Sequence, residues 1–342
     1  MSQERSYIKL FLLLMLCLVL LFFVNISLGS VAIPIDEVFK GLFGQITENE
    51  SWRYIIQNYR LPKAITALIV GSGLGISGLL MQTLFRNPLA GPFVLGISSG
   101  ASLGVAMVIL GASFFSMFAG ILSSKWTLVI AASIGSFLVL LAVLAVSTRV
   151  RDTMAILIIG LMFASITAAI VSVLSYFATA SQLQQYIFWG FGSLGNLSWQ
   201  ELLILSVVFT LGIILSIMSI KALNSLLLGE NYARSLGVNI NRSRILIILA
   251  TSLLAGSITA FAGPIAFIGL AIPHIARQVF NSAHHKILLP AVFLIGAIVM
   301  LICDCIAQLP LSDFTLPINA ITSLFGAPIV IWLLVRKRKL IF

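Results

Sequence analysis

Long apolar runs, each about as long as a bilayer is thick, constrain the fold of this chain more than any other feature. The first covers residues 8–28 and holds one charged side chain, that of Lys9. About 20 apolar residues let a helix cross the hydrocarbon core of a membrane. Because no small-x-small cleavage pattern leads into a soluble domain, we interpret this run as a retained first span. Nine further spans are predicted at residues 61–82, 93–111, 127–147, 154–177, 201–220, 245–262, 264–280, 287–306 and 319–335.

The composition excludes most other classes of protein. Of the 342 residues, 60% are hydrophobic and only 9% are charged, whereas soluble chains carry roughly 25% charged residues. A water-soluble enzyme, a disordered protein and a secreted disulfide scaffold are therefore excluded. Strands of alternating polarity, typical of an outer-membrane barrel, are absent. We predict an all-α, polytopic membrane protein of about ten spans, forming one domain over residues 1–342.

Two polar stretches interrupt the apolar pattern. Residues 29–59 are predicted to form an outer loop with short interfacial helices. Residues 221–244, between the sixth and seventh spans, are predicted to form short helices at the opposite membrane surface. Spans 93–111 and 264–280 are short and contain Gly and Pro, so we expect them to be broken or tilted.

The distribution of Lys and Arg predicts the orientation. If the N-terminus lies inside, fifteen of the 20 Lys and Arg residues fall in inner segments and five in outer segments. This asymmetry follows the positive-inside rule and predicts that both termini are cytoplasmic. It also accounts for the net charge of +10 without a nucleic-acid partner. The inner residues are Arg5, Lys9, Arg86, Arg149, Arg151, Lys221, Arg234, Arg242, Arg244, Arg277, Lys286, Arg336, Lys337, Arg338 and Lys339.

The predicted spans hold almost no ionisable residues. Asp304 lies near the outer end of the ninth span and His274 near the inner end of the eighth, and we interpret both as residues in contact with headgroups or water. Intramembrane carboxylates mark proton and ion pathways, so proton coupling is disfavoured, while sodium coupling through backbone carbonyls stays open. No Ser/His/Asp or H-E-x-x-H arrangement occurs, and Cys303-Asp304-Cys305 is too short for a metal site. We predict no catalytic residue, no metal and no cofactor.

Two glycine-rich segments match the pattern G-x-G-x-x-G, at residues 73–78 and 190–195. Neither follows a strand, as a dinucleotide site requires. The first is better explained by close helix packing, with Gly71 and Gly75 on one face and Gly78 close by. No Walker A sequence is present, so we expect that the chain does not itself hydrolyse ATP.

A series of ordered motifs runs through the chain: Arg60-Leu61-Pro62-Lys63, Met81-Gln82, Asn87-Pro88-Leu89-Ala90, Pro92, Leu95-Gly96, Ser98-Ser99-Gly100-Ala101, Gly229-Glu230, Ala233, Leu236-Gly237, Gly263-Pro264-Ile265-Ala266-Phe267-Ile268-Gly269-Leu270, Ile272-Pro273-His274, Arg277, Leu316-Pro317-Ile318 and Gly326-Ala327-Pro328. Together they closely resemble the FecCD-type permeases, the membrane subunits of type II ABC importers for iron-siderophores, haem and cobalamin. The resemblance covers essentially the whole chain.

The resemblance implies a ten-span protomer in the cytoplasmic membrane that pairs with a second permease protomer, as a homodimer or close heterodimer. The translocation path would follow the dimer interface. Two copies of a cytoplasmic ATPase would dock from inside, and a periplasmic or lipid-anchored substrate-binding protein from outside. Such a permease is a gated conduit for a metal chelate and not an enzyme. The family's inverted relation between spans leaves only a trace here, Gly91-Pro92 before Gly96 against Gly263-Pro264 before Gly269.

Three groups of site residues follow from the resemblance. The inner loop would present a rigid surface to the ATPase, with Glu230 pairing with a basic residue across the interface; its residues are Gly229, Glu230, Ala233, Arg234, Leu236 and Gly237. The binding protein would dock on basic residues of the outer face, which are Arg53, Arg60 and Lys63. The cytoplasmic gate would be formed by Asn87, Leu89, Thr153 and Met154.

Each group also has a plainer explanation. The inner loop could be a solvated loop, Arg60 could be an interfacial anchor, and Thr153 could cap the fifth span. Lys63 stands where Arg is common in the family, and Gln308 replaces a further basic residue. The alternatives to a permease are an ion-coupled secondary transporter, a membrane enzyme and a structural membrane subunit. The cargo and the identity of the second protomer stay open.

Overall fold

The computed structural model describes residues 2–31, 33–45, 48–113, 125–150, 153–309 and 314–335, and within these ranges all regular structure is helical. The bounds are α1 Ser2–Ser27, α2 Ile35–Leu42, α3 Glu50–Ile55, the π-helix η1 Ile56–Arg60, α4 Leu61–Leu84, the 3-10 helix η2 Pro92–Leu95, α5 Ile97–Ile109, the 3-10 helix η3 Gly111–Ser113, α7 Lys125–Arg149, α8 Thr153–Phe177, α9 Ala180–Gly190, α10 Trp199–Met218, α11 Ile220–Leu226, α12 Glu230–Ser235, α13 Ile240–Ala262, α14 Ile268–Phe280, α15 His285–Ala307 and α16 Ile318–Val335.

Every predicted span coincides with a described helix. Seven helices are long and apolar enough to cross a membrane: α1, α4 with the helical turns before it, α7, α8, α10, α13 and α15. The predicted spans 93–111, 264–280 and 319–335 correspond to α5, α14 and α16, which are shorter apolar helices. The all-helical class is therefore confirmed, while the number of true spans stays a prediction.

The two spans expected to be broken are broken. In the first, Gly96 has a φ of 75° and separates η2 from α5. In the second, Gly263 has a φ of 77° and α14 begins only at Ile268. Glycine is suited to both places because it adopts positive φ without a steric penalty. Each break leaves a helix of 13 residues.

Helix α4 is the centre of the bundle. In its most apolar stretch 89% of residues are buried, compared with 11% in α1. Two of its glycines lie directly against backbone: a Cβ built on Gly71 would lie 2.1 Å from the carbonyl oxygen of Gly296, and one on Gly78 would lie 1.7 Å from that of Gly269. The predicted packing role of these glycines is confirmed, since small residues let membrane helices approach closely.

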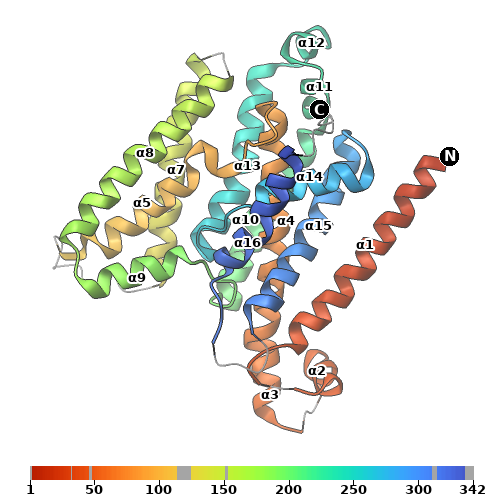
Figure 1. Cartoon of the computed structure of the whole chain (residues 1–342), viewed down its shortest axis with the longest axis vertical. Helices are drawn as coiled ribbons and strands as arrows, with labels where there is room; N and C mark the ends of the chain where they lie inside the picture. Colours follow the sequence, from red (N-terminus) through yellow and green to blue (C-terminus); the bar gives the residue numbers. More distant parts are fainter. Residues whose placement is uncertain are drawn as a thin grey trace.

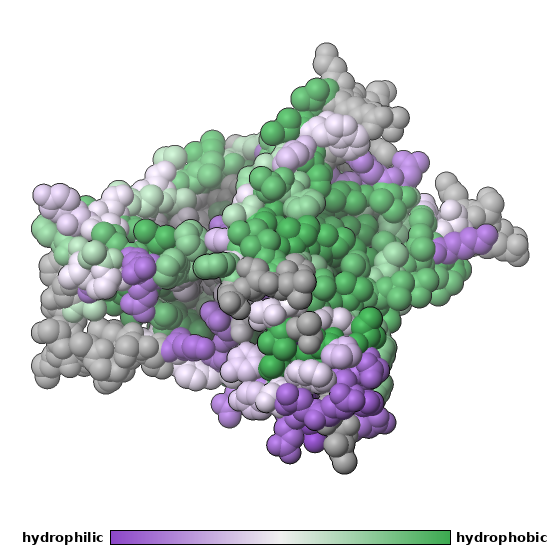
Figure 2. Space-filling model, turned by 60° about the horizontal axis from the view of Figure 1, so that its bottom comes forward, coloured by the Kyte–Doolittle hydropathy of each residue, from purple (hydrophilic) through white to green (hydrophobic). Residues whose placement is uncertain are grey.

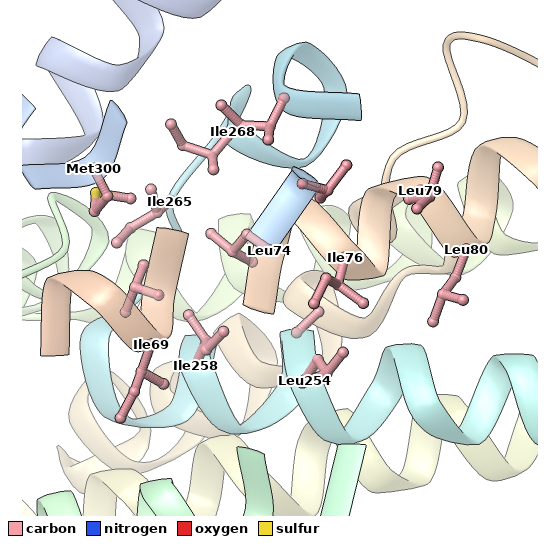
Figure 3. Packing of buried hydrophobic residues seen from close by; sticks show 14 of the residues in the cluster. Ile69, Leu74, Ile76, Leu79, Leu80, Leu254, Ile258, Ile265, Ile268 and Met300 are labelled. Atoms are coloured by element: carbon pink, nitrogen blue, oxygen red, sulfur yellow. The ribbon is translucent and has the colours of Figure 1, made fainter. Parts of the chain in front are cut away.

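The other helices surround α4 in two groups. Helices α10, α13, α14 and α15 pack around α4, and α1 leans on α15, while α5, α7, α8 and α9 form a second group at one side (Figure 1). Leucine and isoleucine side chains from α4, α13 and the segment entering α14 meet in the core between these helices (Figure 3). Side chains such as Leu74 and Ile258 are almost fully enclosed there.

The bundle has two distinct ends. The N-terminus, the end of α16 and the short helices α11 and α12 lie at one end, and α2 and α3 at the other (Figure 1). Hydrophilic residues gather over the α2–α3 end, beside hydrophobic flanks (Figure 2). The segments predicted to be inner thus share one end of the molecule, here named the coupling end; the α2–α3 end is named the docking end.

Candidate functional site

The 221–244 segment forms two short helices, as predicted. Gly229 precedes α12 with a φ of 104°, and Gly237 follows it with a φ of 79°. A side chain at either place would be strained, because positive φ is costly for residues other than glycine. Ala233, within α12, is fully buried. The small residues of the motif therefore shape and seat this loop, while Glu230 and Arg234 lie on its surface side.

Glu230 already has partners within the chain. Its carboxylate lies 3.1 Å from the guanidinium of Arg244 on α13 and 4.0 Å from that of Arg234. Arg244, only 4% exposed at its side chain, also donates to the carbonyl of Val150, just before α8. The expected pairing of Glu230 with the ATPase must therefore compete with Arg244.

Exposed apolar side chains gather on this loop, and of these Leu236 was predicted from the sequence whereas Leu228 and Tyr232 were not. Leu228, Tyr232 and Leu236 are 62%, 53% and 53% exposed, although they lie in a polar segment. They recur every four residues in the sequence; Tyr232 lies on α12, and Leu228 and Leu236 flank this helix on either side. Leu228 and Tyr232 also line a cavity of about 660 Å³, together with Arg86 from the turn after α4. This spacing was the signal that could have found them.

At the docking end, Arg60 is buried and bonded to backbone. Its guanidinium donates to the carbonyls of Ile26, Ser27 and Val31, where α1 ends and the chain turns. These carbonyls have no partner within α1, because the last C=O groups of a helix face no further turn. Arg60 thus fixes the end of α1 to the start of α4, whereas Arg53 on α3 is exposed.

The π-helix at residues 56–60 has a local cause. Pro62 has no N–H, so it cannot donate to a carbonyl of the preceding turn. The carbonyl of Gln57 instead accepts a hydrogen bond of 3.1 Å from the indole of Trp199. The widened turn carries Arg60 into the groove beside α1.

Lys63 forms an ion pair with Asp304. Its ammonium lies 3.1 Å from one carboxylate oxygen, and the other oxygen accepts hydrogen bonds from Asn25 at 2.8 Å and Gln308 at 2.7 Å. Asp304 is 2% exposed, so its interpretation as a water or headgroup contact is wrong. The group lines an open cavity of about 720 Å³ between α1, α4, α15 and the loops after α9 and α15.

The outer segment holds a second ion pair. The carboxylate of Glu37 on α2 accepts hydrogen bonds from the ammonium of Lys40 and from the backbone N–H of Glu48. These bonds favour the charged carboxylate and hold the pKa of Glu37 below its ordinary value. The same bond raises the pKa of Lys40. The bond from the Glu48 N–H joins α2 to the segment that follows it.

The gate residues lie in two separate turns at the coupling end. The side chain of Asn87 accepts the backbone N–H of Leu89, forming a tight turn that leaves Leu89 44% exposed. Thr153 and Met154 begin α8, and Met154 is 45% exposed. The carbonyl of Pro88, inside the first turn, accepts a hydrogen bond from His274, which is 5% exposed. His274 was expected at headgroups or water, and that interpretation is wrong.

No group of three His, Cys, Asp or Glu side chains among the described residues could hold a metal ion. Cys303 and Cys305 flank Asp304 as free thiols on α15. The candidate sites among the described residues therefore consist of charged and polar contacts at the two ends of the helical bundle.

Comparison with known proteins gives consistent matches over nearly the whole chain. The sequence model of the FecCD transport family matches residues 17–336. The hemin transport system permease protein HmuU of Yersinia pestis is 36% identical over 328 residues, covering 95% of this chain and 96% of the relative. The vitamin B12 import system permease protein BtuC of Klebsiella pneumoniae is 38% identical over 339 residues, covering 99% and 96%.

A solved structure shares the fold. It is described as an inward-facing conformation of a metal-chelate type ABC transporter. The two chains superpose with a TM-score of 0.83 at 31% identity, over 96% of this chain and 99% of the other.

Proposed function

The chain belongs to the FecCD transport family, and we propose that it carries a metal chelate of the iron-siderophore, haem or cobalamin class inward across the cytoplasmic membrane. It is a permease subunit of an ABC importer, a transport component and not an enzyme. The match over almost the full length of haem and vitamin B12 permeases carries this conclusion.

The coupling end is proposed to dock an ATPase, in two copies for a permease dimer. The α11–α12 loop offers exposed Leu228, Tyr232 and Leu236 beside a cavity. Apolar and aromatic side chains at the centre of a contact contribute most of the binding energy. In this arrangement Gly229, Ala233 and Gly237 hold the shape of the loop, and Glu230 and Arg234 form its charged rim. The positive-inside distribution supports a cytoplasmic position for this end.

The docking end is proposed to receive an external substrate-binding protein, either periplasmic or lipid-anchored. Exposed Arg53 and partly exposed Lys63 supply positive charge there, and complementary charge steers encounter between proteins. Arg60 contributes by fixing the surface from behind, through its bonds to the end of α1.

The gate is proposed to lie at the coupling end, where Asn87, Leu89, Thr153 and Met154 would close a path between two protomers. Exposed Leu89 and Met154 supply apolar side chains for such a closure. The lipid- or partner-facing sides of α8 and α10 are rich in exposed apolar side chains, which suits pairing with a second copy of this chain.

Co-purification tests the proposal. The tagged chain is expressed with its candidate ATPase, purified in detergent, and assayed for complex formation and ATP hydrolysis. Tyr232→Ala and Leu236→Asp are each expected to weaken binding of the ATPase at least about fivefold, because loss of a central aromatic or apolar contact can cost more than about 1 kcal/mol. Phe43→Ala, an exposed apolar change at the docking end, is the matched control. Failure to recover any ATPase with the wild-type chain would sink the proposal.

The ion-coupled alternative is not favoured by the comparisons. Asp304, which sequence analysis placed near the outer end of a span, is engaged by Lys63, Asn25 and Gln308. Uptake by liposomes that contain the permease alone, driven by a sodium or proton gradient, would revive that alternative.

A further inference from the structure

A chain of buried polar side chains joins the α11–α12 loop to the turn that carries Asn87 and Leu89. It runs through the inner ends of α15, α4 and α14. Buried polar groups are nearly always hydrogen-bonded, and breaking such a bond without replacing it is costly. Groups linked in this way therefore tend to move together.

The first link joins the loop to α15. Oδ1 of Asn224 on α11 accepts the backbone N–H of His285 and also lies 2.9 Å from Nδ1 of that residue. Because an amide oxygen only accepts, Nδ1 of His285 carries a proton. Asn224 thus satisfies the first free N–H of α15 and orients the imidazole below it.

The second link joins α15 to α4. Nε2 of His285 lies 2.9 Å from the hydroxyl of Thr83, and both side chains are fully buried. Thr83 is in the last turn of α4, next to Gln82. One imidazole ring thus links α11 to the inner end of α4.

The third link joins α4 to α14. The carbonyl oxygen of the Gln82 side chain accepts a hydrogen bond of 2.7 Å from the guanidinium of Arg277. The amide nitrogen of the same side chain donates a hydrogen bond of 3.1 Å to the backbone carbonyl of Leu270. Gln82 is fully buried and Arg277 is 7% exposed. The two contacts lie seven residues apart on α14, so the helix is held against α4 along two turns.

The last link reaches the turn itself. Nε2 of His274 donates a hydrogen bond of 2.9 Å to the carbonyl of Pro88. The backbone N–H of Asn87 donates a hydrogen bond of 3.1 Å to the backbone carbonyl of Gln82. The turn is thus held from α4 by backbone and from α14 by one side chain. His274 and Arg277 are three residues apart, on the same face of α14.

We infer that α14 transmits motion of the α11–α12 loop to the gate turn, with His274 as the positioning residue that holds the Pro88 carbonyl. The inference rests on the proposed function, in which the loop binds the ATPase and the turn closes the path. On this mechanism a chain without the His274 bond still binds and hydrolyses ATP through its partner. Its gate turn, however, no longer follows the nucleotide state.

The test reports on the gate turn in the complete transporter, assembled with its ATPase in proteoliposomes. Leu89→Cys is introduced after Cys17, Cys303 and Cys305 are replaced by alanine. The reaction of the new thiol with a membrane-impermeant maleimide is timed with and without ATP, and ATP hydrolysis is measured in the same samples. The ratio of the two labelling rates measures how far the turn follows the nucleotide.

The variants are His274→Ala, His274→Gln and Gln278→Ala. His274→Ala is expected to lower the nucleotide-dependent ratio about fivefold, the factor that one net hydrogen bond contributes, with ATP hydrolysis within about twofold of the parent. His274→Gln keeps an N–H donor and is expected to restore most of the ratio. Gln278→Ala, exposed one turn further along α14, is the matched control.

Two results overturn the inference and are distinguishable. If ATP changes the labelling rate equally in the parent and in His274→Ala, the role of His274 is wrong while the proposed gate stands. If ATP does not change the labelling rate of the parent, the assignment of the turn as a gate is wrong, and so is the inference. His274→Ala could also lose both ATP hydrolysis and the nucleotide dependence of labelling, with no rescue by His274→Gln. That result would show a general structural defect and would also contradict the inference.

Discussion

The ammonium of Lys63 and the carboxylate of Asp304 lie 3.1 Å apart and join the start of α4 to the outer end of α15. The carboxylate is almost completely enclosed, whereas the Lys63 side chain is 21% exposed. The pair therefore neutralises an acid that would otherwise be buried alone in an apolar helix. It also restrains one of the two basic side chains that we propose to meet the external binding protein.

Breaking this pair from one side should destabilise the protein. Asp304→Leu is expected to lower the free energy of unfolding by about 1–3 kcal/mol, because it leaves the Lys63 ammonium without its partner in a partly enclosed site. The double change Asp304→Leu with Lys63→Met should recover most of that loss. Thermal unfolding in detergent measures both. Equal losses in the single and double variants would show that the ion pair contributes nothing.

The contact between α4 and α14 should not tolerate a single added methyl group. In Gly78→Ala the new Cβ would meet the carbonyl of Gly269 at 1.7 Å, so the helices must separate. Overpacking of this kind commonly costs about 1–3 kcal/mol. We expect a lower thermal midpoint and a smaller yield of folded protein. Gly190→Ala, where a Cβ meets nothing within 4 Å, is the control and should match the parent.

The α2 segment should loosen in acid. The pKa of Glu37 is lowered in the folded protein, so its contribution to stability is present above the unfolded pKa, about 4.3, and is lost as pH falls through the folded value. Hydrogen-exchange protection factors of the α2 amides, corrected for intrinsic rates, should fall in that window. Glu37→Gln should remove this acid dependence, and Asp36→Asn, on an exposed side chain, should retain most of it. Protection that is independent of pH in the parent would contradict the role of this pair.

Arg60 should not be replaceable by lysine. Its planar guanidinium donates to three carbonyls at the end of α1, whereas the ammonium of lysine is a compact charge on a flexible stem. Arg60→Lys is expected to speed amide exchange at Leu28 about tenfold, as expected if one or two hydrogen bonds are lost. Arg53→Lys, at an exposed position, should leave that rate unchanged. Equal rates in both variants would mean that Arg60 does not hold this turn.

The sequence predicted the helices well because their signal is local. Runs of apolar residues sufficed to place the helices, and the Gly and Pro content of segments 93–111 and 264–280 indicated that these two are irregular. Close packing at Gly71 and Gly75, with Gly78 close by, was also predicted, since small residues at helical spacing favour close approach; Gly71 and Gly78 meet backbone and Gly75 meets side chains. The glycines at positions 229 and 237 likewise matched the turns that the structure contains.

The partners of charged residues could not be predicted in this way. Lys63 and Asp304 are far apart in the sequence, and nothing in the local pattern of either indicates the other. His274 reads as an interfacial residue until its bond to Pro88 is seen. From the sequence, Glu230 was expected to pair with a basic residue of the ATPase, and its pairing with Arg244 is visible only in the structure. Local periodicity indicates which side chains are enclosed, but only the tertiary arrangement decides what encloses them.

The enclosure of α4 also has a consequence for biogenesis. The helix leaves the ribosome long before α14 and α15, whose backbones its glycines contact. At usual rates of synthesis the roughly 200 residues between α4 and the start of α15 take about 10 to 40 seconds. During that time the small-residue faces of α4 meet lipid or an insertase and not their final neighbours. Assembly of this protein is therefore a late event, and the most enclosed helix is among those that wait longest.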